Sequence, residues 1–399
     1  MHNRQLNILN NQMGYISGET PFSPAEIARR QEAVRAALRA ADCQVLIAQL
    51  CYPTASMALD PYITWLTGTP GYKSTLTLLL PADGELVLVP GSGQQGTAGA
   101  VCPYLGSDTS AMDALLAGAK RIAYCQTGRM QHLFYLYLRE TAPQAEIVEF
   151  SDQLERIKAV KSPEELEALR QAAWIQDMLI TGAAAYLRPG RSCTDIYSDI
   201  MKMLADLGGD LSLMSKLLIA SGKNGVVDGF PTISPATREH LCFPEYRLQE
   251  DDWVHIIYET PGYGGYYGET GRIFYFQEPC AQARDIWKKA VDTLEYQASR
   301  LRPGVTLHTI REETNAYLAS IGSQPDNNIF QIRGIGNMTV DRPQLYGWDH
   351  MELASGMALS LQPRFRNEHG TAIALDTYVV PAEGEAYRFS RLPQELIIL

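Results

Sequence analysis

The chain has 399 residues, of which 46% are hydrophobic and 20% charged, enough apolar material for about two to three conventional domains. Its 45 acidic and 34 basic side chains give a net charge of −11, so we expect no nucleic-acid or anionic-membrane partner. No apolar run approaches the roughly twenty residues of a membrane span, the first residues lack a signal-peptide core, and seven cysteines without CxxC spacing indicate reduced thiols. These features predict a cytoplasmic enzyme.

The first part of the chain alternates helical and strand patterns from about residue 22 to residue 150, which indicates an α/β domain. Ser23 is a suitable helix cap, Pro24 fits the first turn, and a helix is expected over Ser23–Ala41. Short apolar runs predict buried strands at Val45–Ala48 and Leu76–Leu80, and further strands are expected at Glu85–Val89 and Arg121–Tyr124.

A stronger helix start follows and separates the two predicted domains. Ser162 can cap the helix, Pro163 suits its first turn, and Glu165 completes a capping box three residues after the serine. We therefore predict one domain over residues 1–155 and a second over residues 156–399.

The second domain contains an internal repeat. Leu187–Ser192 (LRPGRS) recurs as Leu301–Thr306 (LRPGVT), and each copy is followed by a helical pattern, over Cys193–Leu207 and Leu307–Ile321. A Pro-Gly turn alone can arise by chance, but the matching flanks predict two related halves. Strand-rich stretches are expected at Trp253–Tyr258, Tyr266–Phe276, Met357–Pro363 and Ala372–Val380.

Several motifs occur in an order and spacing typical of one enzyme superfamily. They are Tyr62–Gly68 (a strand end in that superfamily), Ile157–Glu165, Gly265–Arg272, Arg333–Gly336 and Gly356–Pro363. On these the chain resembles the creatinase, prolidase and methionine aminopeptidase superfamily. The resemblance implies an α/β (α+β) fold in which an N-terminal creatinase/prolidase-like domain precedes a pseudo-symmetric pita-bread catalytic domain. It also implies a homodimer.

Metal-dependent members of that superfamily hold two divalent cations with two Asp, one His and two Glu. The corresponding positions here are Tyr258, Glu269, Arg333, Gln362 and Asp376. Only two of these side chains are anionic, and a guanidinium cannot become a ligand. Glu259 is also acidic, but it lies one residue closer to Glu269 than the superfamily spacing between the first two acids requires. Because side chains alternate along a strand, we expect it to face away from the site. The residues therefore predict a site with no metal and no cofactor, as in creatinase.

Creatinase is understood to use a histidine as proton shuttle, and His240 lies at the corresponding spacing, eighteen residues before Tyr258. An imidazole suits proton transfer near neutral pH. The superfamily alignment thus predicts His240, Glu269 and Tyr258 as catalytic residues. It predicts the following as substrate-binding residues: Arg333, Gln362, Asp376 and Tyr267. A surface position for His240, and a structural ion pair of Glu269 with Arg272 or Arg333, remain the alternatives.

The leading hypothesis is a metal-independent, creatinase-like hydrolase that cleaves a C–N bond of a small, polar, anionic compound. Creatine itself is not expected, because the superfamily positions that recognise its guanidinium hold Gly271 and Gln362. Three alternatives stay open: a lyase that abstracts a proton and eliminates a leaving group, a non-catalytic binding homologue, and, last, a metal-dependent Xaa-Pro peptidase.

Overall fold

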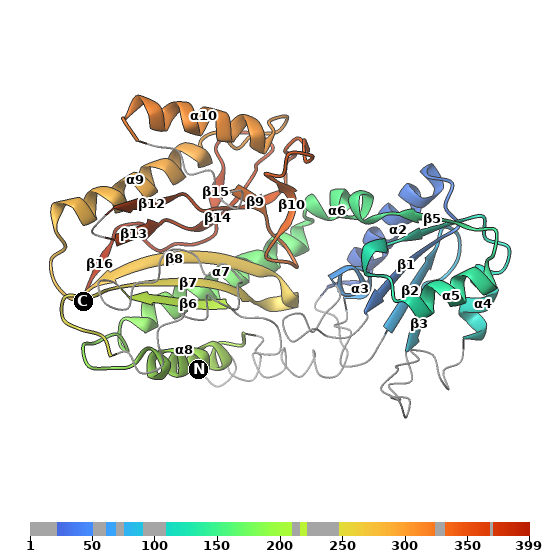
Figure 1. The fold of residues 1–399 in the computed structure, drawn as a ribbon, viewed down its shortest axis with the longest axis horizontal. Coiled ribbons are helices and arrows are strands. Elements are labelled where there is room, and N and C mark those ends of the chain that lie inside the picture. Colours follow the sequence, from blue (N-terminus) through green and yellow to red (C-terminus); the bar gives the residue numbers. More distant parts are fainter. Residues whose placement is uncertain are drawn as a thin grey trace. The chain divides into compact units, whose positions relative to one another are not determined.

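The structure is a computed structural model that describes residues 22–50, 61–68, 76–90, 109–209, 216–221, 247–323, 332–367 and 370–399. The described chain forms two compact units, the first ending at Lys158 and the second beginning at Ala159. The first unit has one sheet and the second has several, as Figure 1 shows, and each unit has its own hydrophobic core.

The first unit is built on a five-stranded mixed sheet with the order β3-β2-β1-β4-β5. Its central strand β1 pairs antiparallel with β2 and parallel with β4. The strands are β1 (Val45–Leu50), β2 (Leu76–Pro81), β3 (Val87–Pro90), β4 (Arg121–Tyr124) and β5 (Glu146–Glu149). The helices are α2 (Pro24–Ala40), α3 (Pro61–Thr67), α4 (Ser110–Leu116), η1 (Thr127–Arg129), α5 (His132–Thr141) and α6 (Ser151–Ala159). Two separate apolar clusters show that both faces of the sheet are covered.

The local signals in this part of the sequence are largely confirmed. Ser23 caps α2 by accepting from the backbone N–H of Glu26, and all four predicted strands occur, with small differences at their ends. The stretch Tyr62–Gly68, expected as a strand end, is instead mostly helix α3. Pro61 fixes the backbone angle that begins a helix, and five consecutive side chains of this short helix are buried.

The second unit places its strands between two sets of helices (Figure 1). One four-stranded sheet has the order β16-β8-β7-β6, a five-stranded sheet has the order β10-β9-β11-β14-β15, and β12 pairs with β13. Helices α7 and α8 share an apolar cluster with β7 and β8, whereas α9 and α10 share another with the C-terminal strands. The strands are β6 (Lys216–Ser221), β7 (Trp253–Pro261), β8 (Tyr267–Tyr275), β9 (Ile332–Gly334), β10 (Asp341–Gln344), β11 (Ala358–Leu361), β12 (Arg364–Asn367), β13 (Gly370–Ile373), β14 (Asp376–Val379), β15 (Tyr387–Arg388) and β16 (Ile397–Ile398). The helices are α7 (Pro163–Ala183), α8 (Cys193–Asp206), η3 (Tyr263–Gly265), α9 (Ala281–Ala298) and α10 (Leu307–Ser320).

The repeated LRPG segments occupy equivalent places in the two halves of this unit. Gly190 and Gly304 both have positive φ, 86° and 83°, which glycine adopts without the strain of a Cβ. Their N–H groups donate to the carbonyls of Leu248 and Leu353, at 2.7 and 2.9 Å. Each turn leads into a helix capped by a hydroxyl, from Ser192 for α8 and Thr306 for α10. The predicted repeat of two related halves is therefore confirmed in detail.

The predicted capping box at the start of α7 is also confirmed. Ser162 accepts from the backbone N–H of Glu165, and the Glu165 carboxylate accepts from the N–H of Ser162. The Tyr266 hydroxyl donates to the same carboxylate, which ties this helix end to the residue before β8. The stretch Ala372–Val380 is not one strand, because it divides into β13 and β14, which belong to different sheets.

Candidate active site

The hairpin of β7 and β8 presents two acidic side chains on one face. Its register pairs Glu259 with Glu269 and Tyr258 with Thr270. Directly opposed residues of an antiparallel pair share a face, and the next residues along point to the other. Both glutamates are buried, Glu269 completely (0% exposed).

The expectation that Glu259 faces away from the site is wrong. In a hairpin the cross-strand register fixes the face, and a loop shortened by one residue can keep two acids opposed. Here the chain turns through η3, where Gly264 and Gly265 have positive φ. A glycine turn of this kind lets β7 and β8 pair with Glu259 directly opposite Glu269. Glu259 therefore lies opposite Glu269, a placement that counting along the sequence missed.

Tyr258 lies on the opposite face of the hairpin, so the structure does not bring it to the two glutamates. It packs in the apolar cluster formed with α7 and α8. Its hydroxyl is buried and has no hydrogen-bond partner within the described ranges. Its strand partner Thr270 likewise faces α7, where its hydroxyl donates to Gln176. The expected catalytic place of Tyr258 beside Glu269 is thus corrected.

Arg333 on β9 joins the two glutamates in one buried cluster. Its Nη2 donates to both Glu269 oxygens, at 2.6 and 2.7 Å, and lies 3.6 Å from Oε1 of Glu259. Its Nη1 donates to Oε1 of Gln362 at 2.8 Å, and its Nε to the carbonyl of Thr339 at 3.1 Å. The guanidinium is therefore surrounded by oxygen acceptors. We call Glu259, Glu269, Arg333, Ser360 and Gln362 the central cluster.

The strand pairing of the five-stranded sheet holds this cluster in place. In β11, Ser360 lies opposite Arg333 of β9 on one side and Thr377 of β14 on the other. The Ser360 hydroxyl donates to Oε2 of Glu269. The Thr377 hydroxyl bonds the backbone N–H and carbonyl of Glu269, at 3.2 and 3.3 Å. A charge-assisted pair of this kind, buried and held from several strands, has a fixed geometry.

Asp376 does not belong to the central cluster, contrary to the expectation that it binds substrate beside Arg333. It is fully buried in a second ion pair, where Nη2 of Arg272 lies 3.2 Å from both its oxygens. Arg388 and Gln394 donate to it as well, at 3.2 and 3.0 Å. The cause is strand alternation, because Arg272 lies three residues after Glu269 on β8 and Asp376 lies one residue before Thr377 on β14, so each points to the other face of its strand.

Two further predicted site residues have different outcomes. Tyr267 lies two residues before Glu269 on β8 and so on the same face, and its side chain is buried. Its N–H donates to the carbonyl of Gly336 at 2.8 Å. His240, the predicted proton shuttle, lies outside the described residues.

His255 is a buried imidazole to which the sequence gave no signal. It is 2% exposed, one ring nitrogen bonds the backbone of Ile373, and Nε2 has no partner within the described ranges. Burial, helped by the nearby Arg272 charge, lowers the pKa of His255 to about 4. Its ring packs edge-on against Trp287. It is a neutral core histidine at neutral pH.

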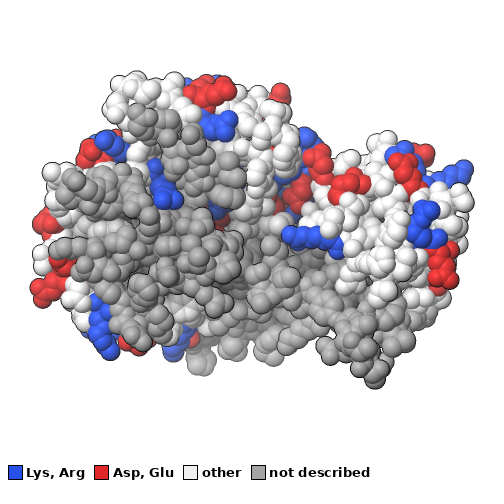
Figure 2. Space-filling view, viewed as in Figure 1, with Lys and Arg blue, Asp and Glu red and all other residues white. Residues whose placement is uncertain are grey.

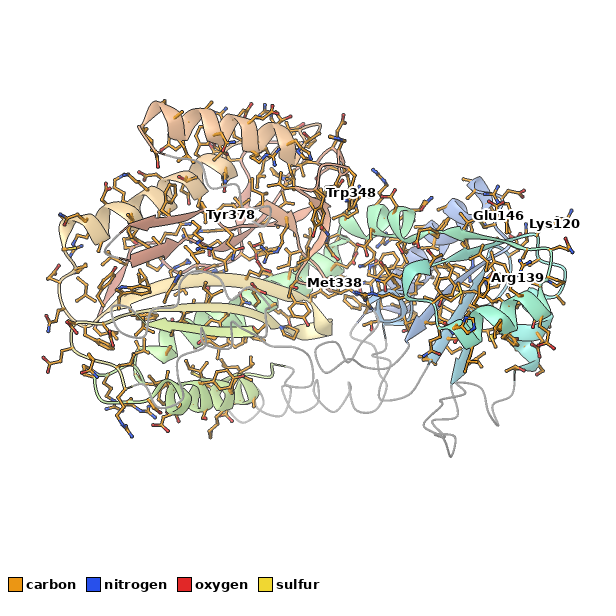
Figure 3. All side chains as sticks on the ribbon, viewed as in Figure 1. Lys120, Arg139, Glu146, Met338, Trp348 and Tyr378 are labelled. Carbon is orange, nitrogen blue, oxygen red and sulfur yellow. The ribbon has the colours of Figure 1, made fainter. Side chains whose placement is uncertain are left out.

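Other polar groups of this unit serve the scaffold. Tyr378, labelled in Figure 3, donates from β14 to Glu295 of α9 at 2.9 Å. Trp348 in the same view is 63% exposed on the loop after β10, where it stacks against Tyr346. On the face drawn in Figure 2, acidic and basic side chains intermingle over the described surface. Within the described residues, no helix is long and apolar enough to cross a membrane.

The residues of the central cluster do not provide the ligands that a pair of divalent cations needs. Such cations need several carboxylate or imidazole ligands, and among the described residues no group of three or more His, Cys, Asp and Glu side chains could hold a metal ion. Glu259 and Glu269 are suitable ligands in kind, but the Arg333 guanidinium lies against both. A divalent cation could take these carboxylates only if Arg333 moved away, so the arrangement does not fit the metal pair.

Comparison with known proteins gives the family. Residues 167–389 match the model of metallopeptidase family M24, and residues 30–160 match the creatinase/prolidase N-terminal domain. The chain belongs to metallopeptidase family M24. A probable dipeptidase PepE of Mycobacterium bovis is 24% identical over 382 residues, which covers 90% of this chain and 98% of the relative.

Solved structures confirm the fold. Dipeptidase PepE from Mycobacterium ulcerans has a TM-score of 0.72 at 22% identity, covering 94% of this chain and 99% of its own. The prolidase from Pyrococcus horikoshii OT3 also has a TM-score of 0.72, at 16% identity, covering 92% and 100%. The predicted class is therefore confirmed: an α/β protein with a creatinase/prolidase-like N-terminal domain and a pita-bread domain.

The comparisons also correct the function predicted from sequence. The chain is an enzyme of the hydrolase kind, as expected. The metal-independent, creatinase-like hydrolase and the lyase are overturned, because the relatives are named dipeptidases and prolidases within a metallopeptidase family. The peptidase, placed last among the alternatives, is the one that these relatives favour.

Proposed function

We propose that the chain is a hydrolase of short peptides, with dipeptides as its first substrate class. The observation that carries this proposal is the nearly end-to-end match to a probable dipeptidase, 90% of this chain and 98% of the relative, in addition to family membership. Agreement over both domains supports a shared architecture rather than a shared module. The xaa-Pro dipeptides form a natural subset to test, because a prolidase is among the structural neighbours.

The reaction adds one water across a peptide bond. The water oxygen bonds to the carbonyl carbon, the C–N bond breaks, and the leaving nitrogen takes a proton, which yields a carboxylate and an amine. Groups that hold water, move a proton and stabilise the carbonyl oxygen are therefore needed. The polar groups of the central cluster are of these kinds, and we derive no step through a metal.

We assign the central cluster as the place of this chemistry. Glu269 is held closely by Arg333 and orients the substrate or water, whereas Glu259 stands farther from the guanidinium. Tyr267 lines the same face of the hairpin. His240 keeps its proposed role as proton shuttle. Asp376 and Tyr258 are left to structural roles by their surroundings.

The test is amino-acid release from a panel of dipeptides with and without a C-terminal proline. Purified full-length protein is incubated with each dipeptide, in buffer alone and with added Mn²⁺, and the products are identified by mass spectrometry in ¹⁸O-labelled water. We expect free amino acids with one labelled oxygen in the new carboxylate. Intact dipeptides under both conditions would contradict the proposal.

The remaining expectations about partners and place also stand as proposals. We expect a small-molecule substrate, a homodimer in solution, a cytoplasmic location, no nucleic-acid partner and a functional division between residues 155 and 156. A monomer mass in light scattering at micromolar concentration would contradict the dimer.

A further inference from the structure

Gln362 directly follows β11, and the two polar atoms of its side-chain amide, Oε1 and Nε2, have different surroundings. Its Oε1 accepts from Nη1 of Arg333 at 2.8 Å. Its Nε2 is buried and has no hydrogen-bond acceptor within the described ranges. The residue as a whole is 3% exposed.

Arg333 determines which polar atom of the Gln362 amide is the oxygen and which is the nitrogen. A guanidinium only donates hydrogen bonds, so the amide atom that faces Arg333 must be the carbonyl oxygen. The NH₂ group then necessarily points away from Arg333, and rotation of the amide would place two donors against each other. The orientation is therefore determined by chemistry and does not depend on distinguishing oxygen from nitrogen.

A buried donor without an acceptor costs about 1–3 kcal/mol and calls for an explanation, and at Gln362 the adjacent cluster of Arg333, Glu259 and Glu269 points to a bound ligand that supplies the acceptor. The central cluster has two glutamates and one arginine, which leaves one formal negative charge when both acids are ionised. An anionic carboxylate would be repelled there. A neutral carbonyl oxygen is the acceptor that suits both the donor and the charge.

We propose that Nε2 of Gln362 donates a hydrogen bond to the carbonyl oxygen of the substrate's peptide bond. This inference rests on the proposed peptide hydrolysis and deepens it, because it names the substrate atom that one side chain recognises. Arg333 acts through Gln362 as a positioning residue, since it turns the amide so that the donor faces the substrate.

The test removes the hydrogen bond from both sides. Two variants change the protein: Gln362→Glu keeps an acceptor for Arg333 but loses the donor, and Gln362→Met loses both. The ligands are a dipeptide that wild type hydrolyses and its trans-alkene isostere, which keeps the same terminal charges but lacks the peptide carbonyl. Gln297→Met is the matched control, because Gln297 is a buried glutamine on α9 whose amide atoms also have no partner within the described ranges.

We expect both Gln362 variants to lower kcat/KM for the dipeptide by roughly three- to tenfold, the value of one neutral hydrogen bond. The inhibition constant of the alkene isostere should stay within about twofold of wild type, since that ligand never uses the donor. Gln297→Met should leave both constants unchanged.

Three results would overturn the inference. Equal losses for dipeptide and isostere would mean that Gln362 only supports the site, and no loss for either would mean that it does not touch the substrate. If the wild-type protein neither hydrolysed dipeptides nor bound the isostere, the proposed function would fail together with this inference. The first two of these results, obtained while wild type hydrolyses the dipeptide, would overturn the inference and leave the proposed function standing.

Discussion

Replacing Arg333 by methionine tests whether the central cluster stabilises the fold. The substitution removes the cation from Glu269 and Glu259, which are 0% and 1% exposed, and leaves Gln362 Oε1 and the Thr339 carbonyl without this donor. Breaking a buried ion pair by deleting one partner typically costs about 3–5 kcal/mol, because the remaining charge stays buried. That cost is a large part of the roughly 5–15 kcal/mol by which a domain is stable.

The assay is urea unfolding followed by circular dichroism, at pH 7.5 and again at pH 5. We expect Arg333→Met to lose about 3–5 kcal/mol of unfolding free energy at the higher pH. The deficit should shrink at pH 5, because the unpaired buried Glu269 takes up a proton more readily than it does in the unfolded chain. A native state that binds more protons than the unfolded state gains stability as the pH falls.

Two further variants separate this effect from a general loss of arginine. Arg388→Met removes a half-buried partner of Asp376, which keeps Arg272, and should cost less than about 1 kcal/mol. The double variant Arg333→Met/Glu269→Met should recover part of the loss, because apolar side chains can replace a buried pair. A loss below about 1 kcal/mol for Arg333→Met, or an equal loss for Arg388→Met, would refute the reasoning.

Three other predictions concern single residues. Burial and the Arg272 charge lower the pKa of His255 to about 4. The unfolded chain therefore binds the proton first, and the unfolding free energy falls as the pH drops from about 6.5 toward 4. Between pH 7 and pH 5, wild type should lose about 2 kcal/mol more unfolding free energy than His255→Gln. Equal acid sensitivity of the two proteins would contradict this. Tyr258→Phe deletes a buried hydroxyl without an acceptor in the described ranges, so unfolding free energy should hold or rise by about 1 kcal/mol and dipeptide turnover should not change. Ser162→Ala should lose about 1 kcal/mol in the same unfolding assay, because the Glu165 capping box is broken; no loss would mean that the helix end is held by other contacts.

The features predicted well from sequence are those whose cause is local. The capping box at Ser162 and Glu165 depends only on residues three apart, and the LRPG turns at Gly190 and Gly304 require only a glycine and a following cap. The interactions that form the capping box and the turns are made within a few residues of the chain. The repeat of these signals was sufficient to predict two related halves.

The features predicted poorly depend on strand register. Whether Tyr258 or Glu259 faces Glu269 is set by a glycine turn whose length the sequence did not reveal. Asp376 faces Arg272 rather than Arg333 because it lies one position off the favourable face. An error of one residue moves a side chain to the other side of a sheet, so a motif match alone cannot assign such a site.

The reaction class was predicted wrongly from the sequence for a different reason. Replacement of the expected ligands favoured a creatinase-like enzyme, whereas the relatives are peptidases. The first replacement was an artefact of the alignment, because Glu259 supplies an acid opposite Glu269. The replacement at Arg333, the third of the five positions, is real, and its guanidinium pairs with both acids. Residue identity at aligned positions therefore gave the chemistry of the cluster but not the reaction class.

The most direct test of the account is the rate of dipeptide hydrolysis by wild type and by Glu269→Gln, measured as amino-acid release under identical conditions. The amide oxygen of the variant can still accept from Arg333 and Ser360, whereas its NH₂ group replaces the other oxygen that accepts from Arg333, so unfolding curves are measured to verify that the fold is preserved. If the central cluster is the active site of a peptidase, wild type hydrolyses dipeptides and the variant is at least about a hundredfold slower. Equal rates in the two proteins, or no hydrolysis by wild type, would contradict it.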